Sequence, residues 1–263
     1  MRFVVKIGTS TLAHAGGRLN IRRVELLCKV LSDIKNAGHQ VVLVSSGAIG
    51  MGTGKLGLPG RPGDMPGKQA AAAVGQCELM YTYDRLFSQY SHVVAQILLT
   101  AEDIYHSVRS SHVHDTLERL LQWNVLPIIN ENDVVATDEI GIQTTIGEND
   151  TLSAIVARLL GADLLVLLSD IDGLYTADPR KHAGAELIPR VEALSPQILA
   201  LAEGAGSALG SGGMATKLKA AGIVMDAGID MIIANGERPE ILYDIFDGKA
   251  VGTRFVGKEK VTL

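Results

Sequence analysis

Short apolar runs alternate along this chain with longer stretches of helical periodicity, and this alternation limits the possible folds more than any other feature. The apolar runs carry almost no polar positions, which is typical of strands buried on both faces of a parallel sheet. The sequence therefore predicts an α/β fold, a three-layer αβα sandwich with a central, mainly parallel sheet. The expected strands cover residues 3–7, 40–44, 92–99, 125–129, 163–168 and 229–234.

The intervening stretches place apolar residues three and four positions apart, as one face of a helix requires. The first such helix is expected to begin after Asn20, a good N-cap residue, and to end at Gly38. No internal repeat or linker interrupts the 263 residues, so we expect a single domain and no additional one. The other expected helices cover residues 68–89, 111–123, 150–160 and 214–227.

Composition and charge exclude several classes of protein. The formal net charge of −5 and the pI of about 5.8 argue against a general nucleic-acid binder. No apolar run approaches the roughly 20 residues of a membrane span, and no secretory pattern begins the chain. Cys28 and Cys77 both lie in helix-like stretches, which argues against a disulfide scaffold or a cysteine zinc site. We therefore expect a soluble, cytoplasmic protein with no membrane or nucleic-acid partner.

Polar clusters follow four of the expected strands directly. They comprise residues 6–10, 45–52, 130–133 and 169–170. Most polar residues after strands are ordinary turn residues. In open parallel sheets, however, ligands bind at the carboxyl ends of the strands, and four such clusters together favour a binding site at that edge.

Two glycine-rich segments lie next to expected helix starts, at residues 45–50 and 210–217. Glycines allow backbone N–H groups to approach a phosphate, and a helix N-terminus adds positive potential. Lys217 falls in the first turn of its helix, where the helix dipole disfavours a cation unless an anion lies nearby. Residues 52–57 match G-x-G-x-x-G by letter but begin well after the strand, so we reject them as a dinucleotide fingerprint, and no P-loop motif is present.

Two charged residues have alternative interpretations. Lys6 interrupts an apolar strand and is either an edge lysine extending to solvent or a lysine facing an anion; the adjacent Gly8 favours the second. Asp150 opens a helix and either caps it or holds two lysines in position.

These motifs, taken together and in order, resemble the amino acid kinase family, and within it the members that phosphorylate glutamate. The resemblance extends from about Arg2 to Phe255 and includes no C-terminal domain of the PUA type, which many such relatives carry. The motifs that carry it are Lys6-Ile7-Gly8-Thr9-Ser10, Val44 to Ile49, Asn130 to Asp133, Gly147 to Ala154, Ser169 to Tyr175 and Gly212 to Lys217.

The resemblance implies transfer of the γ-phosphoryl group of ATP to the side-chain carboxylate of L-glutamate, the first step of proline synthesis. Lys6 and Lys217 would act on the phosphoryl group, with Asp150 orienting both. Ser46, Asp133 and Asn149 would bind glutamate. Mg²⁺ would accompany ATP, with no direct protein ligand. The residues implied in ATP binding are Lys6, Gly8, Ser169, Asp170, Ser211, Gly212, Gly213, Met214, Ala215, Thr216 and Lys217.

The resemblance also implies an N-terminal part that binds the amino acid and a C-terminal part that binds the nucleotide. It further implies feedback inhibition by proline, a homo-oligomer, and functional coupling to glutamyl phosphate reductase. Two alternatives stay open at this point. One is a kinase of the same family acting on acetylglutamate, aspartate or a nucleoside monophosphate; the other is a non-catalytic amino-acid sensor, although such a sensor is expected to lose Lys6, Asp150 or Lys217.

Overall fold

A computed structural model describes residues 1–14, 18–135, 148–202 and 213–259 of the chain. Within these residues the strands form one eight-stranded sheet in the order β3-β4-β2-β1-β5-β7-β8-β6. Neighbouring strands are parallel except for β7 and β8, which are antiparallel. The strands are β1 (Arg2–Ile7), β2 (Gln40–Ser45), β3 (Val94–Leu99), β4 (Leu126–Glu131), β5 (Leu164–Ser169), β6 (Arg190–Val191), β7 (Asp230–Asn235) and β8 (Thr253–Phe255).

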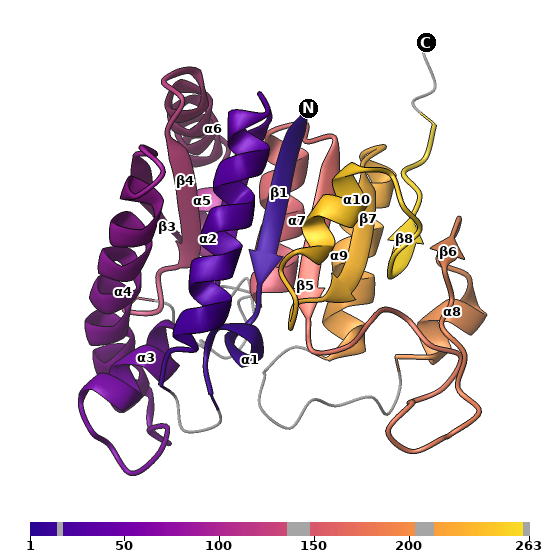
Figure 1. Cartoon of the computed structure of the whole chain (residues 1–263), viewed down its shortest axis with the longest axis horizontal. Helices are drawn as coiled ribbons and strands as arrows, with labels where there is room; N and C mark the ends of the chain where they lie inside the picture. Colours follow the sequence, from indigo (N-terminus) through magenta and orange to yellow (C-terminus); the bar gives the residue numbers. More distant parts are fainter. Residues whose placement is uncertain (15–17, 136–147, 203–212, 260–263) are drawn as a thin grey trace.

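Helices cover both faces of the sheet, as the alternating sequence pattern predicts (Figure 1). One layer contains α2 (Ile21–Asn36), α4 (Met65–Ser88) and α10 (Ile241–Phe246); the other contains α5 (Ala101–Tyr105), α6 (Ser107–Gln122), α7 (Asn149–Leu159) and α9 (Met214–Asp226). The remaining helices are α1 (Thr9–Leu12), α3 (Ala48–Lys55) and α8 (Pro196–Ala200). The expected α/β fold with a mainly parallel sheet is confirmed.

Alternation along β1 assigns its side chains to the two layers. Phe3 and Val5 belong to the apolar cluster of the α2 and α4 layer, whereas Val4 belongs to the cluster that includes residues of α7 and α9. Successive side chains of a strand point to opposite faces, so Lys6 faces the same layer as Val4. The only charged residue of the strand's buried stretch is thereby directed toward the N-termini of α7 and α9.

The C-terminal part of the fold departs most from the expectation. The strand β8 and the helix α10 have no counterpart among the expected elements, and β8 runs antiparallel to β7; the short elements α1, α3, α5, α8 and β6 were not expected either. Gly252 makes this pairing possible: its φ is +65°, and a Cβ there would lie 2.1 Å from the carbonyl oxygen of Ile233. Most other differences are shifts of a few residues at element ends, such as α6, which begins at Ser107 rather than at residue 111.

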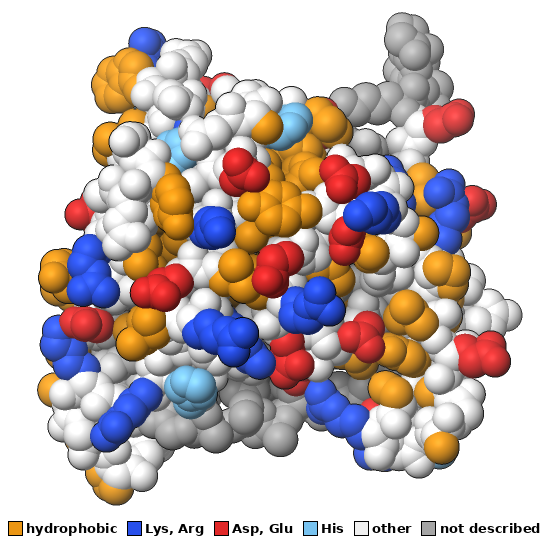
Figure 2. All heavy atoms as spheres, in the orientation of Figure 1, with side chains coloured by type: hydrophobic (Ala, Val, Ile, Leu, Met, Phe, Trp, Pro, Cys, Tyr) orange, Lys and Arg blue, Asp and Glu red, His pale blue; other side chains and the backbone are white. Residues whose placement is uncertain are grey.

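Two surface properties bear on possible partners. The face shown in Figure 2 carries Lys, Arg, Asp and Glu side chains interspersed over the helices, rather than a continuous basic surface. In the part of the chain that the structure describes, no helix combines the length and the apolar character that crossing a membrane requires.

Candidate active site

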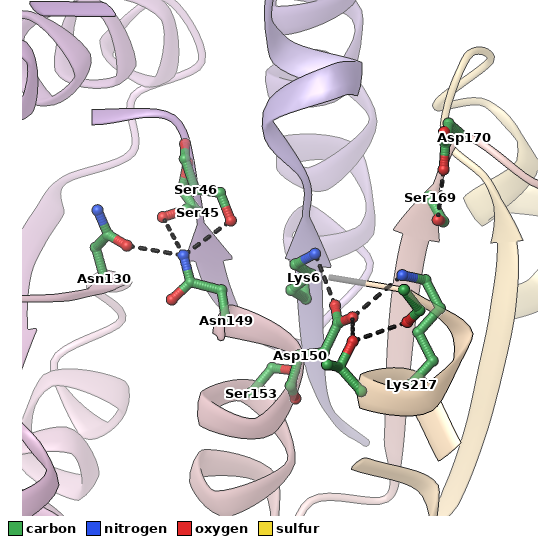
Figure 3. A network of polar contacts seen from close by, with 12 residues as sticks. Lys6, Ser45, Ser46, Asn130, Asn149, Asp150, Ser153, Ser169, Asp170 and Lys217 are labelled. Carbon is green, nitrogen blue, oxygen red and sulfur yellow. Dashed lines mark hydrogen bonds and ion pairs between the residues drawn. The ribbon is translucent and has the colours of Figure 1, made fainter. Parts of the chain in front are cut away.

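A buried carboxylate joins two lysines from different parts of the sequence at the carboxyl edge of the sheet (Figure 3). Lys6 Nζ lies 2.7 Å from Asp150 Oδ1, and Lys217 Nζ lies 3.1 Å from Asp150 Oδ2. The side chain of Asp150 is 1% exposed, and those of Lys6 and Lys217 are 11% and 6% exposed. The three residues come from α7, β1 and α9, so the cluster exists only in the folded chain.

The electrostatics of this cluster keep the carboxylate ionised. Burial would raise the pKa of Asp150, but the charges of Lys6 and Lys217 outweigh it and hold that pKa at about 2. Burial also lowers the pKa of Lys6, against the opposing attraction of Asp150. The ammonium groups of Lys6 and Lys217 repel one another, and the carboxylate of Glu148 also attracts both.

The structure decides between the two interpretations of Asp150. The N-cap of α7 is Glu148, and Asp150 is the second residue of the helix, so capping was the wrong interpretation. Both carboxylate oxygens are occupied by the lysines, and Thr216 Oγ1 lies 3.0 Å from Oδ2. The carboxylate of Asp150 also explains how Lys217 is tolerated in the first turn of α9. It is the nearby anion that the helix dipole requires, although it lies far from Lys217 in the sequence.

A second polar network lies beside the first, centred on Asn149. Its Nδ2 donates to Ser46 Oγ at 2.8 Å and to Asn130 Oδ1 at 2.9 Å, with the carbonyl oxygen of Ser45 at 3.4 Å (Figure 3). These residues come from the ends of β2 and β4 and from the start of α7. Two of the expected substrate-binding residues, Ser46 and Asn149, are therefore in direct contact.

The third expected substrate-binding residue, Asp133, lies two positions after the end of β4 and is half-buried. Burial raises the pKa of Asp133, while the positive charge of Arg61 acts in the opposite direction. Arg61 belongs to the loop between α3 and α4, so this loop lies near enough to influence the carboxylate.

Sequence reasoning missed the residues that support this network. Asn130 Nδ2 donates to Gln76 Oε1 at 3.0 Å, and Tyr83 OH lies 2.9 Å from Ser45 Oγ. Asn130 lies in one of the polar clusters that follow the strands, but the cluster alone does not indicate a separate role for it. Gln76 and Tyr83 lie within the long helix α4, and a polar residue within a helix gives no sequence signal of a distant partner.

The residues expected to bind the nucleotide occupy three places. Gly8 is the N-cap of α1, where a Cβ would lie 3.4 Å from Lys6 Nζ. Ser169 donates to Asp170 at 3.2 Å, and Asp170 in turn pairs with Arg180 at 3.0 Å.

Gly213 is the N-cap of α9, with Met214, Ala215, Thr216 and Lys217 forming the first turn of that helix. The side chain of Met214 packs into the core, whereas Ala215 is exposed. The two remaining residues expected to bind the nucleotide, Ser211 and Gly212, lie outside the described residues.

The chain also matches a model of a known protein family. The model is described as the amino acid kinase family, and it covers residues 1–235. The chain belongs to the amino acid kinase family. The strand-end motifs with Lys6, Asp150 and Lys217 are thus part of a family match that spans most of the molecule.

Curated relatives agree with this family assignment, and solved structures agree with the fold. A protein called glutamate 5-kinase from Clostridium perfringens is 51% identical to this chain, and the match covers 98% of this chain and 96% of the relative. Another protein of that name, from Clostridium tetani, is 53% identical, and the match covers 96% of this chain and 93% of the relative. Carbamate kinase from Giardia lamblia superposes with a TM-score of 0.68 at 20% identity, covering 98% of each chain. Isopentenyl phosphate kinase from T. acidophilum gives a TM-score of 0.65 at 19% identity, covering 97% of this chain and all of the other. This member of the amino acid kinase family therefore shares its fold with kinases acting on different acceptors.

Proposed function

We propose that this protein transfers the γ-phosphoryl group of ATP to the side-chain carboxylate of L-glutamate, forming L-glutamyl 5-phosphate for proline synthesis. The observation that carries the proposal is the buried cluster of Lys6, Asp150 and Lys217 beside the Asn149 network. Membership of the amino acid kinase family and about 50% identity to proteins called glutamate 5-kinase support the choice of acceptor.

The charges of the cluster suit transfer between two anions. A carboxylate acceptor is already ionised at neutral pH, so the reaction requires no general base. What it requires is positive charge fixed where negative charge moves during the transfer. We assign this role to Lys6 and Lys217, with Asp150 as the positioning residue that holds both ammonium groups in place.

The neighbouring network suits an amino acid. Ser46 and Asn149 offer hydrogen bonds at the ends of the strands, and Asp133 offers a carboxylate for the substrate ammonium group. A nucleoside monophosphate acceptor would call instead for paired arginines. We therefore assign the part of the site next to β2 and β4 to the amino acid and the part next to β5 and α9 to the nucleotide.

Magnesium enters this proposal as part of the MgATP substrate. Among the described residues, no group of three or more His, Cys, Asp or Glu side chains is arranged to hold a metal ion. Asp150, the buried carboxylate of the cluster, is occupied by the two lysines. Mg²⁺ bound with ATP would lower the negative charge of the nucleotide, and the steps assigned above rest on the protein's own residues.

Regulation and assembly extend the proposal. Proline carries the same α-carboxylate and ammonium groups as glutamate, so we propose that it inhibits by competing at the amino-acid site. We also propose a homo-oligomer functionally coupled to glutamyl phosphate reductase, which would receive the unstable acyl phosphate, and a cytoplasmic location for both.

The deciding experiment measures ADP release from MgATP with glutamate, N-acetylglutamate, aspartate and UMP as separate acceptors. We expect release with glutamate alone, and trapping of the product with hydroxylamine as the hydroxamate of an acyl phosphate. Equal or faster release with another acceptor would reject glutamate as the substrate. No release with any acceptor, from folded protein that binds ATP, would favour the sensor alternative.

A further inference from the structure

Two backbone groups determine which end of the Asn149 side-chain amide is the nitrogen and which is the oxygen. The carbonyl oxygen of Ser45 can only accept, so the atom facing it is Nδ2 of Asn149. The backbone N–H of Glu131 can only donate, at 2.9 Å, so the atom of Asn130 that receives it is Oδ1. The same Oδ1 accepts from Asn149, and both amides are thereby assigned without ambiguity.

This assignment leaves each amide with one remaining group. Nδ2 of Asn149 already faces three acceptors, more than its two hydrogens can fully serve. Its Oδ1 is buried and has no hydrogen-bond partner among the described residues. A buried acceptor without a partner is costly, so this atom is the one available to an N–H donor of a ligand. A carboxylate cannot fill that position because it can only accept.

The remaining group of Asn130 is Nδ2, and its partner is Gln76 Oε1 at 3.0 Å. Both residues are buried, with 8% of Gln76 and 3% of Asn130 exposed. Gln76 lies on α4, in the opposite helix layer from α7, and reaches Asn130 at the end of β4. The chain of hydrogen bonds therefore runs from α4 through β4 to the start of α7.

We propose that Gln76 is a positioning residue: by accepting from Asn130, it holds the Asn130 and Asn149 amides so that Asn149 Oδ1 faces the ammonium group of the amino-acid substrate. This inference rests on the proposed function, since it assigns the network to the amino acid. It adds that the network recognises the substrate nitrogen as a hydrogen-bond donor, through a residue that makes no contact with the substrate itself.

The test compares three variants of one helix. Gln76→Met removes the accepting oxygen at nearly the same length, and Gln76→Glu keeps an oxygen at that position. Thr82→Val is the matched control: Thr82 is 9% exposed and its hydroxyl donates to the carbonyl oxygen of Glu78 on the same helix. All three change a largely buried polar side chain of α4, but Gln76 alone reaches the network.

We expect Gln76→Met to raise the KM for glutamate about tenfold, the effect of one lost buried hydrogen-bond partner, with kcat and the KM for ATP within about threefold of the parent. Gln76→Glu should recover most of the affinity, and Thr82→Val should leave every constant near the parent value. In an Asn149→Ala background, Gln76→Met should have little further effect, because its influence passes through Asn149. An unchanged KM for glutamate, an equal loss in all constants, or full additivity with Asn149→Ala would overturn the proposal.

A second measurement does not depend on the substrate. Exchange of the Asn149 side-chain amide hydrogens, followed by NMR, should be slow in the parent and in Thr82→Val and much faster in Gln76→Met. Unchanged exchange in Gln76→Met overturns the positioning role even if glutamate is not the acceptor. Faster exchange in a protein that does not phosphorylate glutamate would instead reject the proposed function and leave Gln76 as the residue that positions this network.

Discussion

Lys6 and Lys217 meet on opposite oxygens of one carboxylate, although one lies on the first strand and the other on α9. The side chains of Lys6, Asp150 and Lys217 are almost entirely buried, and the carboxylate of Glu148 also attracts both lysines. The two ammonium groups repel one another at this distance, and a phosphate bound between them would relieve that repulsion.

Removing either lysine should reduce turnover much more than substrate binding. We expect Lys6→Ala and Lys217→Ala each to lower kcat about a thousandfold, which corresponds to about 4 kcal/mol of transition-state stabilisation. The KM for glutamate should change little, because its expected binding groups lie in the Asn149 network. Lys→Arg should not restore turnover fully, since a planar guanidinium replaces a compact charge. Steady-state kinetics with circular dichroism checks this, and near-normal turnover in folded Lys217→Ala would reject the mechanism.

Asp150→Asn should lose activity as severely as the lysine variants, because Asp150 positions both. It should also lower the free energy of unfolding by about 3–5 kcal/mol near neutral pH, since two buried lysines lose their partner. The pKa of Asp150 is about 2 in the folded protein and about 4 when unfolded, so its contribution is complete above pH 4 and is lost as the pH falls toward 2. Denaturant titrations should show this acid-dependent loss in the parent and a smaller one in Asp150→Asn.

Asp133→Asn tests the expected partner of the substrate ammonium group. The substitution keeps the size of the side chain and removes its charge, so the KM for glutamate should rise by an amount equivalent to about 2–5 kcal/mol. The KM for ATP should stay near the parent value. If the ATP constant rose and the glutamate constant did not, Asp133 would belong to the nucleotide part of the site.

A close crossing of α3 and α4 should be essential for stability. A Cβ on Gly52 would lie 1.8 Å from the carbonyl oxygen of Ala71, and one on Gly75 would lie 1.8 Å from that of Ala48. Gly52→Ala and Gly75→Ala should therefore each destabilise the fold by about 1–3 kcal/mol or more, because neither clash involves a movable side chain. Gly60→Ala, where no atom lies within 4 Å of the added Cβ, is the control and should unfold at the parent temperature.

His92 should make the fold sensitive to mild acid. It is 7% exposed, and burial lowers its pKa, with the nearby charge of Lys35 adding to the effect. A histidine whose pKa is lowered by folding binds fewer protons in the folded state, so its contribution to stability is present above about pH 6.5 and declines as the pH falls. The difference in unfolding free energy between pH 7.5 and 5.5 should be smaller in His92→Gln than in the parent; an equal difference would show that other groups are responsible.

The sequence by itself determined the sheet and the edge of the sheet that carries the polar groups. Runs such as residues 41–44 and 164–168 are apolar throughout, and only burial on both faces accommodates that pattern. Polar residues directly after such runs fall at one edge because parallel strands all end there. Both inferences depend on local periodicity, which the sequence displays directly.

The tertiary structure alone decided how those polar groups are joined. The alternation of side chains along β1 directs Lys6 toward α7 and α9. Only the placement of both helices brings Asp150 between Lys6 and Lys217. Gln76 reaches Asn130 because α4 packs where the glycines at its crossing with α3 allow the two helix backbones to approach. Such contacts join residues far apart in the chain and depend on packing distances, which local sequence patterns do not encode.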